Sequence, residues 1–255
     1  MLMDSPRCDL DTGAMKDTGT NDRVPSIRKE LRRLADREIA EHSQRFFKTG
    51  KGQYGEGDRF LGIRVPALRK IARQYREVSV EEACRLLESP FHEERLLALF
   101  LLVGLFSKAD DERRRAIYEL YLANTRFINN WDLVDCSAEH VVGAYLRQRD
   151  RQPLYDLAAS NSLWARRISI MSTFHFIKHG EFADTLRIAE ILLADKEDLI
   201  HKAVGWMLRE VGKRDAGTEE EFLKKHCRQM PRTMLRYAIE KFPALKRQRY
   251  LTGRA

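Results

Sequence analysis

Apolar residues recur three and four positions apart along almost the whole chain from Ser26 onward, and no run of alternating β-branched residues interrupts this pattern. This spacing predicts amphipathic α-helices and an all-α protein. Ser26 is placed to cap a charged helix that we expect to continue to about Phe47, and Pro66 is placed to open the next helix. The longest apolar run, residues 96–106, is too short to span a membrane and fits a buried helix.

The predicted helices come in pairs that repeat. Their junctions are expected near residues 89–90, 110, 129–130, 160–161, 195 and 230–231. A basic residue precedes an apolar run at Arg95, Arg167, Lys202 and Arg236, with gaps of 72, 35 and 34 residues. Because 72 is twice 36, an intervening repeat has its equivalent position at Trp131. Helix pairs with this period are typical of a HEAT-like α-solenoid, a superhelical stack of antiparallel helix pairs, and no tetratricopeptide consensus is visible.

Equivalent positions of the inner helices line up along the concave face of such a stack. The register position then places four basic residues, Arg95, Arg167, Lys202 and Arg236, in one groove that Trp131 interrupts. One helical turn later, Asp135 and Trp206 fall near the same interruption. We therefore expect a concave basic groove with two tryptophans and one carboxylate in its middle.

The charge is unevenly distributed. The formal net charge is +8, but residues 1–22 carry five Asp against one Arg and one Lys, a net of −3, which leaves +11 for the remainder. We expect residues 1–24 to be a disordered N-terminal tail and residues 25–255 to form a single HEAT-like repeat domain. The tail has no apolar segment typical of a signal peptide, and the four cysteines form no CxxC, so a reducing cytoplasm and, for a basic protein, association with the nucleoid are expected.

The central residues have an ordinary interpretation. A tryptophan in a helical repeat usually belongs to the core, and Asp132 or Asp135 could serve as a cap or first-turn carboxylate. However, Trp131 and Asp135 are four residues apart and share a helix face. Asp135 is expected near a helix N-terminus, where the helix dipole and Arg167 would keep it ionised. A carboxylate between two indoles in a basic groove suits a phosphodiester that carries a cationic reacting sugar.

Four segments, in order, carry a family resemblance: residues 60–66 (FLGIRVP), 129–135 (NNWDLVD), 163–167 (LWARR) and 202–210 (KAVGWMLRE). They resemble motifs of the AlkD-like DNA alkylation-repair glycosylases, and the resemblance extends over about residues 26–245. It implies a HEAT-like superhelix that grips duplex DNA and releases cationic alkylated purines.

The resemblance also implies roles for individual residues. Asp135 matches the catalytic carboxylate, Trp131 and Trp206 match aromatics that flank the sugar-phosphate, and Arg167 matches an arginine that contacts phosphate. The residues expected to bind DNA are Tyr54, from the N-terminal loop, with Arg64, Arg95, Arg166, Lys202, Arg209 and Arg236. The expected activity is that of a monomeric, monofunctional glycosylase of base excision repair. It would hydrolyse the N-glycosidic bond of N3- or N7-alkylated purines without metal or cofactor.

The chemistry agrees with this assignment. Glycosidases ordinarily need two carboxylates, one of which protonates the leaving group. A purine alkylated at N3 or N7 is already cationic and leaves without that acid, so one carboxylate suffices to stabilise the oxocarbenium-like sugar and orient water.

Two other classes remain open. A non-catalytic HEAT-like nucleic-acid-binding protein would need the same basic groove, but not Asp135 between two tryptophans. A protein–protein scaffold would leave the charge of +11 unexplained. His175 and His179 are four apart, but no third ligand for a metal is evident.

Overall fold

The computed structural model describes residues 22–254, and within them the chain is helical, with one isolated β-bridge between Arg59 and Phe91 and no strand. The predicted all-α class is confirmed. Residues 1–21 of the predicted tail lie outside the described residues. The first described helix begins at Val24, which is buried.

The chain divides into two compact units, with the boundary in the sequence between Lys108 and Ala109. The N-terminal unit contains α1 (Val24–Arg33), α2 (Arg37–Phe46), α3 (Val65–Gln74), α4 (Val80–Leu87) and α5 (His92–Lys108). The C-terminal unit contains α6 (Asp111–Ala123), η1 (Thr125–Phe127), α7 (Trp131–Asp135), the π-helix η2 (Glu139–Gly143), α8 (Ala144–Leu146), α9 (Gln152–Ala158), α10 (Leu163–Ser172), α11 (Phe174–Ile177), α12 (Ala183–Ile191), η3 (Leu192–Ala194), α13 (Asp198–Gly212), α14 (Ala216–His226), α15 (Arg232–Ala238), η4 (Ile239–Lys241) and α16 (Ala244–Leu251). The single domain expected over residues 25–255 stays a prediction.

The first predicted helix is in fact two helices. Ser26 is not a cap but lies inside α1, which begins at Val24. The chain then turns, and the Asp36 carboxylate caps α2 by accepting a hydrogen bond from the Ile39 amide at 3.0 Å. Helix α1 buries one apolar face, whereas α2 buries no residue, so the two segments cannot continue one amphipathic face.

The segment 58–63, which leads into α3, is held by the first turn of α5. The buried carboxylate of Glu93 accepts hydrogen bonds from the amides of Leu61, Gly62 and Ile63 at 2.8, 2.7 and 3.2 Å. Gly62 has φ of +82°, and a Cβ there would lie 1.9 Å from the Asp36 carbonyl oxygen. Only glycine fits this position, which explains the glycine of the FLGIRVP motif.

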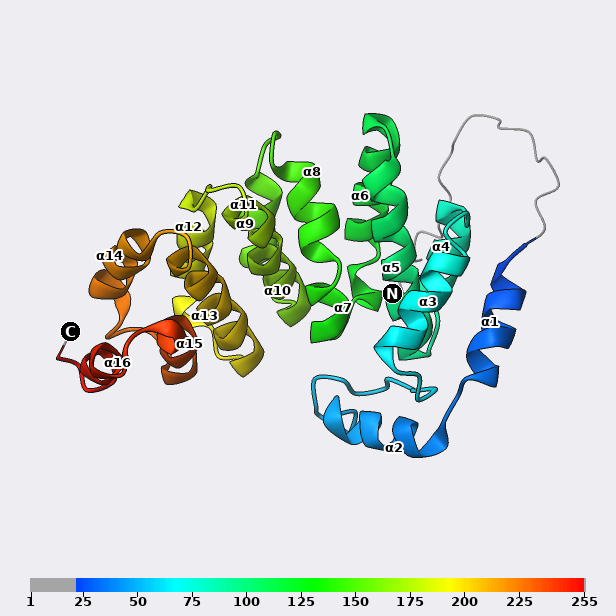
Figure 1. Ribbon diagram of the computed structural model, residues 1–255, viewed down its shortest axis with the longest axis horizontal. Helices are drawn as coiled ribbons and strands as arrows, with labels where there is room; N and C mark the ends of the chain where they lie inside the picture. The colour runs from blue at the N-terminus through cyan, green and yellow to red at the C-terminus, as the bar shows by residue number, and fades with distance from the viewer. Residues whose placement is uncertain (1–21, 255) are drawn as a thin grey trace, which may run out of the picture. The chain divides into compact units, whose positions relative to one another are not determined.

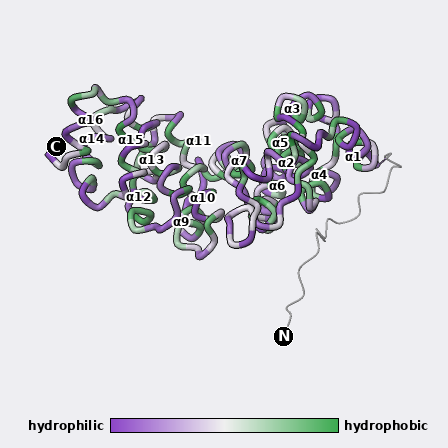
Figure 2. The backbone as a smooth tube through the Cα atoms, turned by 90° about the horizontal axis from the view of Figure 1, so that it is seen from below, coloured by the Kyte–Doolittle hydropathy of each residue, from purple (hydrophilic) through white to green (hydrophobic). Residues whose placement is uncertain are grey.

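The inner helices of the C-terminal unit stack in the predicted order, but the predicted register is shifted at Trp131. Trp131 is the first residue of α7, whereas Arg167, Lys202 and Arg236 are each the fifth residue of their helices, a position that Asp135 holds in α7. Helices α7, α10, α13 and α15 each contact the next in the series, and they carry Trp131, Arg167, Lys202 and Arg236 (Figure 1). The predicted junctions coincide with helix starts, as at Asp110 and Asn130, which cap α6 and α7. Hydrophobic and hydrophilic stretches alternate along these helices (Figure 2), as expected for elements that bury one face.

The apolar run 96–106 lies in α5, whose side chains are mostly buried. No helix in the described residues is long and apolar enough to cross a membrane.

Close helix packing in the C-terminal unit depends on glycine. A Cβ on Gly205 of α13 would lie 2.4 Å from the Met234 carbonyl oxygen and 2.5 Å from the Tyr237 Cβ of α15. The two helices could therefore not approach as closely with any larger residue.

Gly205→Ala is expected to lower the free energy of unfolding by about 1–3 kcal/mol, because the added methyl overpacks this contact. Gly104→Ala is the matched control, since Gly104 lies in α5 with nothing within 4 Å of an added Cβ. This control should gain about 0.5–1 kcal/mol from the better helix former. Urea unfolding followed by circular dichroism measures both, and equal effects of the two variants would contradict the packing argument.

Candidate active site

The most distinctive polar contact of the C-terminal unit joins Asp135 to Arg167. The Arg167 Nε donates to Asp135 Oδ1 at 2.9 Å and Nη2 donates to Oδ2 at 2.7 Å, which is the bidentate arrangement of a strong charge-assisted pair. Arg167 Nη1 donates to the Leu199 carbonyl oxygen of α13. The Arg167 side chain is 5% exposed, whereas Asp135 is 16% exposed. The arginine is therefore buried behind a carboxylate that still reaches the surface.

Asp135 is the last residue of the five-residue helix α7 and does not lie in its first turn. The expected stabilisation of its charge by a helix N-terminus is therefore wrong. Burial raises the pKa of Asp135, the Arg167 guanidinium opposes this rise, and Asp132 adds to it. Arg167 is thus the group that favours the ionised carboxylate.

A buried hydrogen-bonded layer fixes the chain beneath this pair. The hydroxyl groups of Tyr121 and Ser137 lie 2.9 Å apart, and Ser137 Oγ donates to the Leu133 carbonyl oxygen at 2.6 Å. The Tyr121 side chain is wholly buried. These residues were missed by sequence reasoning, because a lone tyrosine and serine on apolar helix faces carry no recognisable spacing.

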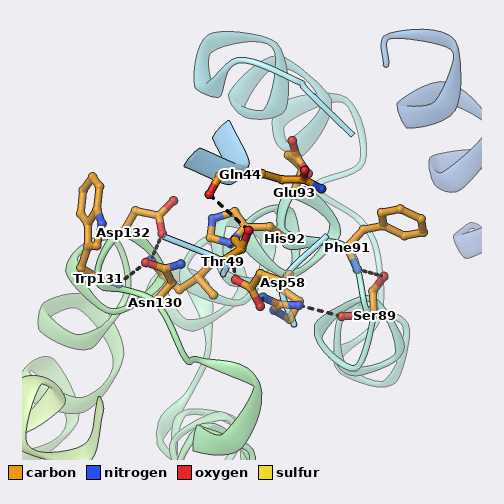
Figure 3. Close-up of polar contacts among 12 residues, drawn as sticks. Gln44, Thr49, Asp58, Ser89, Phe91, His92, Glu93, Asn130, Trp131 and Asp132 are labelled. Carbon is orange, nitrogen blue, oxygen red and sulfur yellow. Dashed lines mark hydrogen bonds and ion pairs between the residues drawn. The ribbon is translucent and has the colours of Figure 1, made fainter. Parts of the chain in front are cut away.

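Trp131 begins α7 and is half-buried. The Asn130 side chain caps this helix by accepting a hydrogen bond from the Trp131 amide at 2.9 Å (Figure 3). The cap is therefore Asn130, and not Asp132 as expected from the sequence. The Asp132 carboxylate accepts a hydrogen bond from the Leu133 amide at 3.0 Å instead.

Trp206 lies on α13, beside α10. Among the described residues its ring and hydrogen-bond contacts are with Phe174, whose ring centroid is 6.2 Å away, and with Glu210, and not with Asp135. The structure therefore places Trp131, Asp135 and Arg167 on adjoining helices α7 and α10, and Trp206 on the next helix of the stack.

Several predicted DNA-binding arginines are engaged within the protein. Arg95 is the clearest correction: its side chain is 5% exposed, and Nη2 donates to Asp58 Oδ1 at 2.7 Å. Asp58 also lies 3.2 Å from the Nδ1 of the buried His92 (Figure 3). Arg95 is therefore an interior residue of the N-terminal unit, so its expected contact with DNA is not favoured.

Arg166 and Arg209 form ion pairs between successive repeats. Arg166 Nε donates to Asp195 Oδ2 at 2.6 Å, and its Nη1 donates to the Ser160 and Asn161 carbonyl oxygens at 3.0 Å. Arg209 pairs with Glu240. Both side chains are mostly buried, so their expected contact with DNA is not favoured.

The remaining predicted contacts are more accessible. Lys202 is partly exposed and pairs with Asp198 at 2.7 Å, and Arg236 is exposed. In the N-terminal unit Arg64 is exposed, and Tyr54 is half-buried with Lys48 Nζ 5.9 Å from its ring centroid.

The two histidines considered as metal ligands lie together, with ring centroids 4.7 Å apart. Burial lowers the pKa of His175 to about 4, and neighbouring His179 contributes. No group of three or more His, Cys, Asp or Glu residues in the described part of the chain is arranged to hold a metal ion.

The stacked helix pairs and the arginine-held carboxylate define a helical-repeat protein with a candidate active site between its repeats. The sequence profile of the DNA alkylation repair enzyme family matches residues 27–242, and the chain belongs to this family. The fold is similar to that of a solved structure described as a predicted DNA alkylation repair enzyme from Enterococcus faecalis. The TM-score is 0.64 at 16% identity, over 83% of this chain and 98% of that chain. No curated protein sequence gives a significant match.

Arg95→Met is expected to cost about 3–5 kcal/mol of stability, because it breaks a buried ion pair by removing the guanidinium that binds Asp58. The exposed Arg236→Met should change stability by less than about 0.5 kcal/mol and instead weaken binding to duplex DNA. Thermal unfolding and fluorescence-anisotropy titration separate the two effects. An Arg95→Met protein of normal stability and weakened DNA binding would contradict the interior role of Arg95 and support its expected contact with DNA.

Proposed function

We propose that this protein is a monofunctional DNA glycosylase that releases N3- and N7-alkylated purines from duplex DNA and leaves an abasic site. The observation that carries the proposal is the partly exposed Asp135 carboxylate, held by both oxygens on a buried arginine. Membership of the DNA alkylation repair enzyme family supports DNA as the substrate. Within that substrate class, one oriented carboxylate suits a leaving group that is already cationic.

Asp135 would act when the glycosidic bond lengthens and positive charge develops on the deoxyribose. A fixed carboxylate at this position stabilises the oxocarbenium-like sugar and accepts a hydrogen bond from the attacking water. No second carboxylate is needed to protonate the base, because alkylation at N3 or N7 has placed the positive charge there already. The reaction therefore needs no metal or cofactor.

Arg167 has a different role in this proposal from the phosphate contact suggested by the resemblance. Three of its N–H groups already point at Asp135 and at the Leu199 carbonyl oxygen. Its main task is then to orient Asp135 and to favour its ionised form against the effect of burial.

Trp131 and Trp206 would flank the sugar-phosphate of the damaged nucleotide. An indole face near the developing cation contributes about 0.5–2 kcal/mol, depending on how far it is desolvated. The exposed Arg236 and Arg64, the partly exposed Lys202 and Tyr54 would contact the DNA backbone, and binding should weaken with salt. Contacts to the backbone leave the base itself unenclosed, which would tolerate bulky adducts.

Asp135→Asn should abolish release of 3-methyladenine and 7-methylguanine from methylated duplex DNA while DNA affinity stays nearly unchanged. The amide keeps the shape of the side chain but not the charge that stabilises the sugar cation. Chromatography of released bases measures the loss. Asp132→Asn is the matched control, because this neighbouring carboxylate bonds the Leu133 amide and should retain activity. Wild-type protein that binds DNA but releases no base above the spontaneous rate would instead indicate a non-catalytic nucleic-acid-binding protein.

The pH dependence of base release should report the Asp135–Arg167 pair. Only ionised Asp135 stabilises a cation, so activity falls as the pH drops through its pKa, which burial raises. Arg167→Gln removes the group that lowers this pKa, and the acid limb of the rate profile should move to higher pH. Arg166→Gln is the control, since Arg166 pairs with Asp195 and should leave the limb in place. An unmoved limb in the Arg167 variant would exclude Asp135 as the titrating group.

A further inference from the structure

Trp206 is held at its polar edge by a buried acid. Its indole Nε1 donates to Glu210 Oε1 at 3.3 Å, and the two residues lie four positions apart on one face of α13. The Glu210 side chain is only 8% exposed. Burying a carboxylate is unfavourable unless charged or polar partners compensate, so Glu210 needs such partners.

Two cations compensate the buried charge. Lys213 Nζ lies 2.6 Å from Glu210 Oε1, and Arg214 Nη1 lies 3.2 Å from Oε2 and 2.9 Å from the Glu210 carbonyl oxygen. Burial would raise the pKa of Glu210, but Lys213, Arg214 and the Trp206 indole together hold it below its usual range. Glu210 is thus a fixed anion, with one oxygen shared between Lys213 and the indole.

Phe174 supports the ring of Trp206 and is itself framed by cations. Its ring centroid is 6.2 Å from that of Trp206, and Lys178 Nζ and Arg214 Cζ lie 4.3 and 5.8 Å from its own centroid. Lys178 is in turn bound to the buried Glu139 at 2.5 Å. Arg214 therefore binds Glu210, which accepts the indole N–H, and also lies over the Phe174 ring, which packs beside the indole.

We infer that Glu210 is a positioning residue for the proposed reaction, and that it fixes the Trp206 indole in the one orientation that can meet the deoxyribose. This inference rests on the proposed function. A half-buried tryptophan has two side-chain torsions, and packing against Phe174 alone leaves the indole free to choose among rotamers. The hydrogen bond to Glu210 selects one of them before DNA arrives, which is the preorganisation that lowers a reaction barrier.

The test compares Glu210→Met, which removes the acceptor but keeps the side-chain volume, with Glu210→Gln, which keeps an oxygen for the indole and loses the charge. The first readout is the rate of base release from methylated duplex DNA under saturating protein, together with DNA affinity. The second readout is the indole Nε1–H resonance of Trp206 in the ¹⁵N-labelled full chain, assigned by its loss in Trp206→Phe. Lys213→Met is the matched control, because it removes one ion pair and leaves the indole bond.

Glu210→Met should slow base release about tenfold with DNA affinity within about twofold, and it should move the Trp206 resonance upfield. Glu210→Gln should restore most of both properties, and Lys213→Met should leave the resonance in place. A folded Glu210→Met protein with a wild-type rate, or with an unmoved indole resonance, would overturn the inference. If Glu210→Met does not fold, the Glu210→Gln protein decides the question. A Trp206 indole resonance in that protein at the chemical shift of free tryptophan would overturn the inference.

The two proposals fail in different ways. Wild-type protein that releases no base would contradict the proposed glycosylase, whereas the Trp206 resonance decides the positioning of the indole without any turnover. A merely structural Glu210 would lower the melting temperature in all three variants and would not separate Glu210→Gln from Glu210→Met.

Discussion

The buried guanidinium of Arg167 connects three successive layers of the C-terminal unit. It lies on α10, binds the carboxylate at the end of α7 and donates to a backbone carbonyl at the start of α13. A bidentate pair fixes distance and orientation together, so the spacing of these layers and the direction of the Asp135 carboxylate are set by one group. The candidate active site and the stacking of the repeats therefore depend on the same interaction.

The other arginines follow the same principle. Arg166 ties the start of α10 to Asp195, which precedes α13, and Arg209 ties α13 to Glu240, which follows α15. Arg166 and Arg209 thus each bind an acid of a neighbouring repeat. The periodic charge in the sequence therefore reports the stacking of the repeats at Arg166 and Arg209, whereas Arg64 and Arg236 are exposed.

The spacing of apolar residues predicted the helices and their order, but not which basic residues are buried. The helical class, the junctions and the order of the stacked helices follow from spacing, and the structure confirms them. The register predicted for Trp131 was wrong, because α7 begins at this residue and not four residues before it. Spacing also predicted that Arg167 lies near Asp135. It could not show that Arg95 is buried, because its partner Asp58 lies 37 residues away in a loop without periodicity.

The break between α1 and α2 was missed for a similar reason. Charged residues continue through it, and the Asp36 cap that begins α2 is one acidic residue within a charged stretch, so it carries no distinctive signal. Glu210 is the exception among the missed residues. Its position four residues after Trp206 is a recognisable helical spacing and could have been noticed.

The tryptophan at position 131 has a consequence for the carboxylate one turn later. In α13 a lysine at such a spacing forms an ion pair, since Lys202 pairs with Asp198 four residues before it. A lysine or arginine at position 131 would reach Asp135 at the same spacing and would neutralise the side of the carboxylate that Arg167 leaves open. Trp131 cannot form this second ion pair, and among the described residues Asp135 pairs with Arg167. In the proposed function, the tryptophan thus leaves the charge of Asp135 available to the sugar cation and not to a second basic side chain.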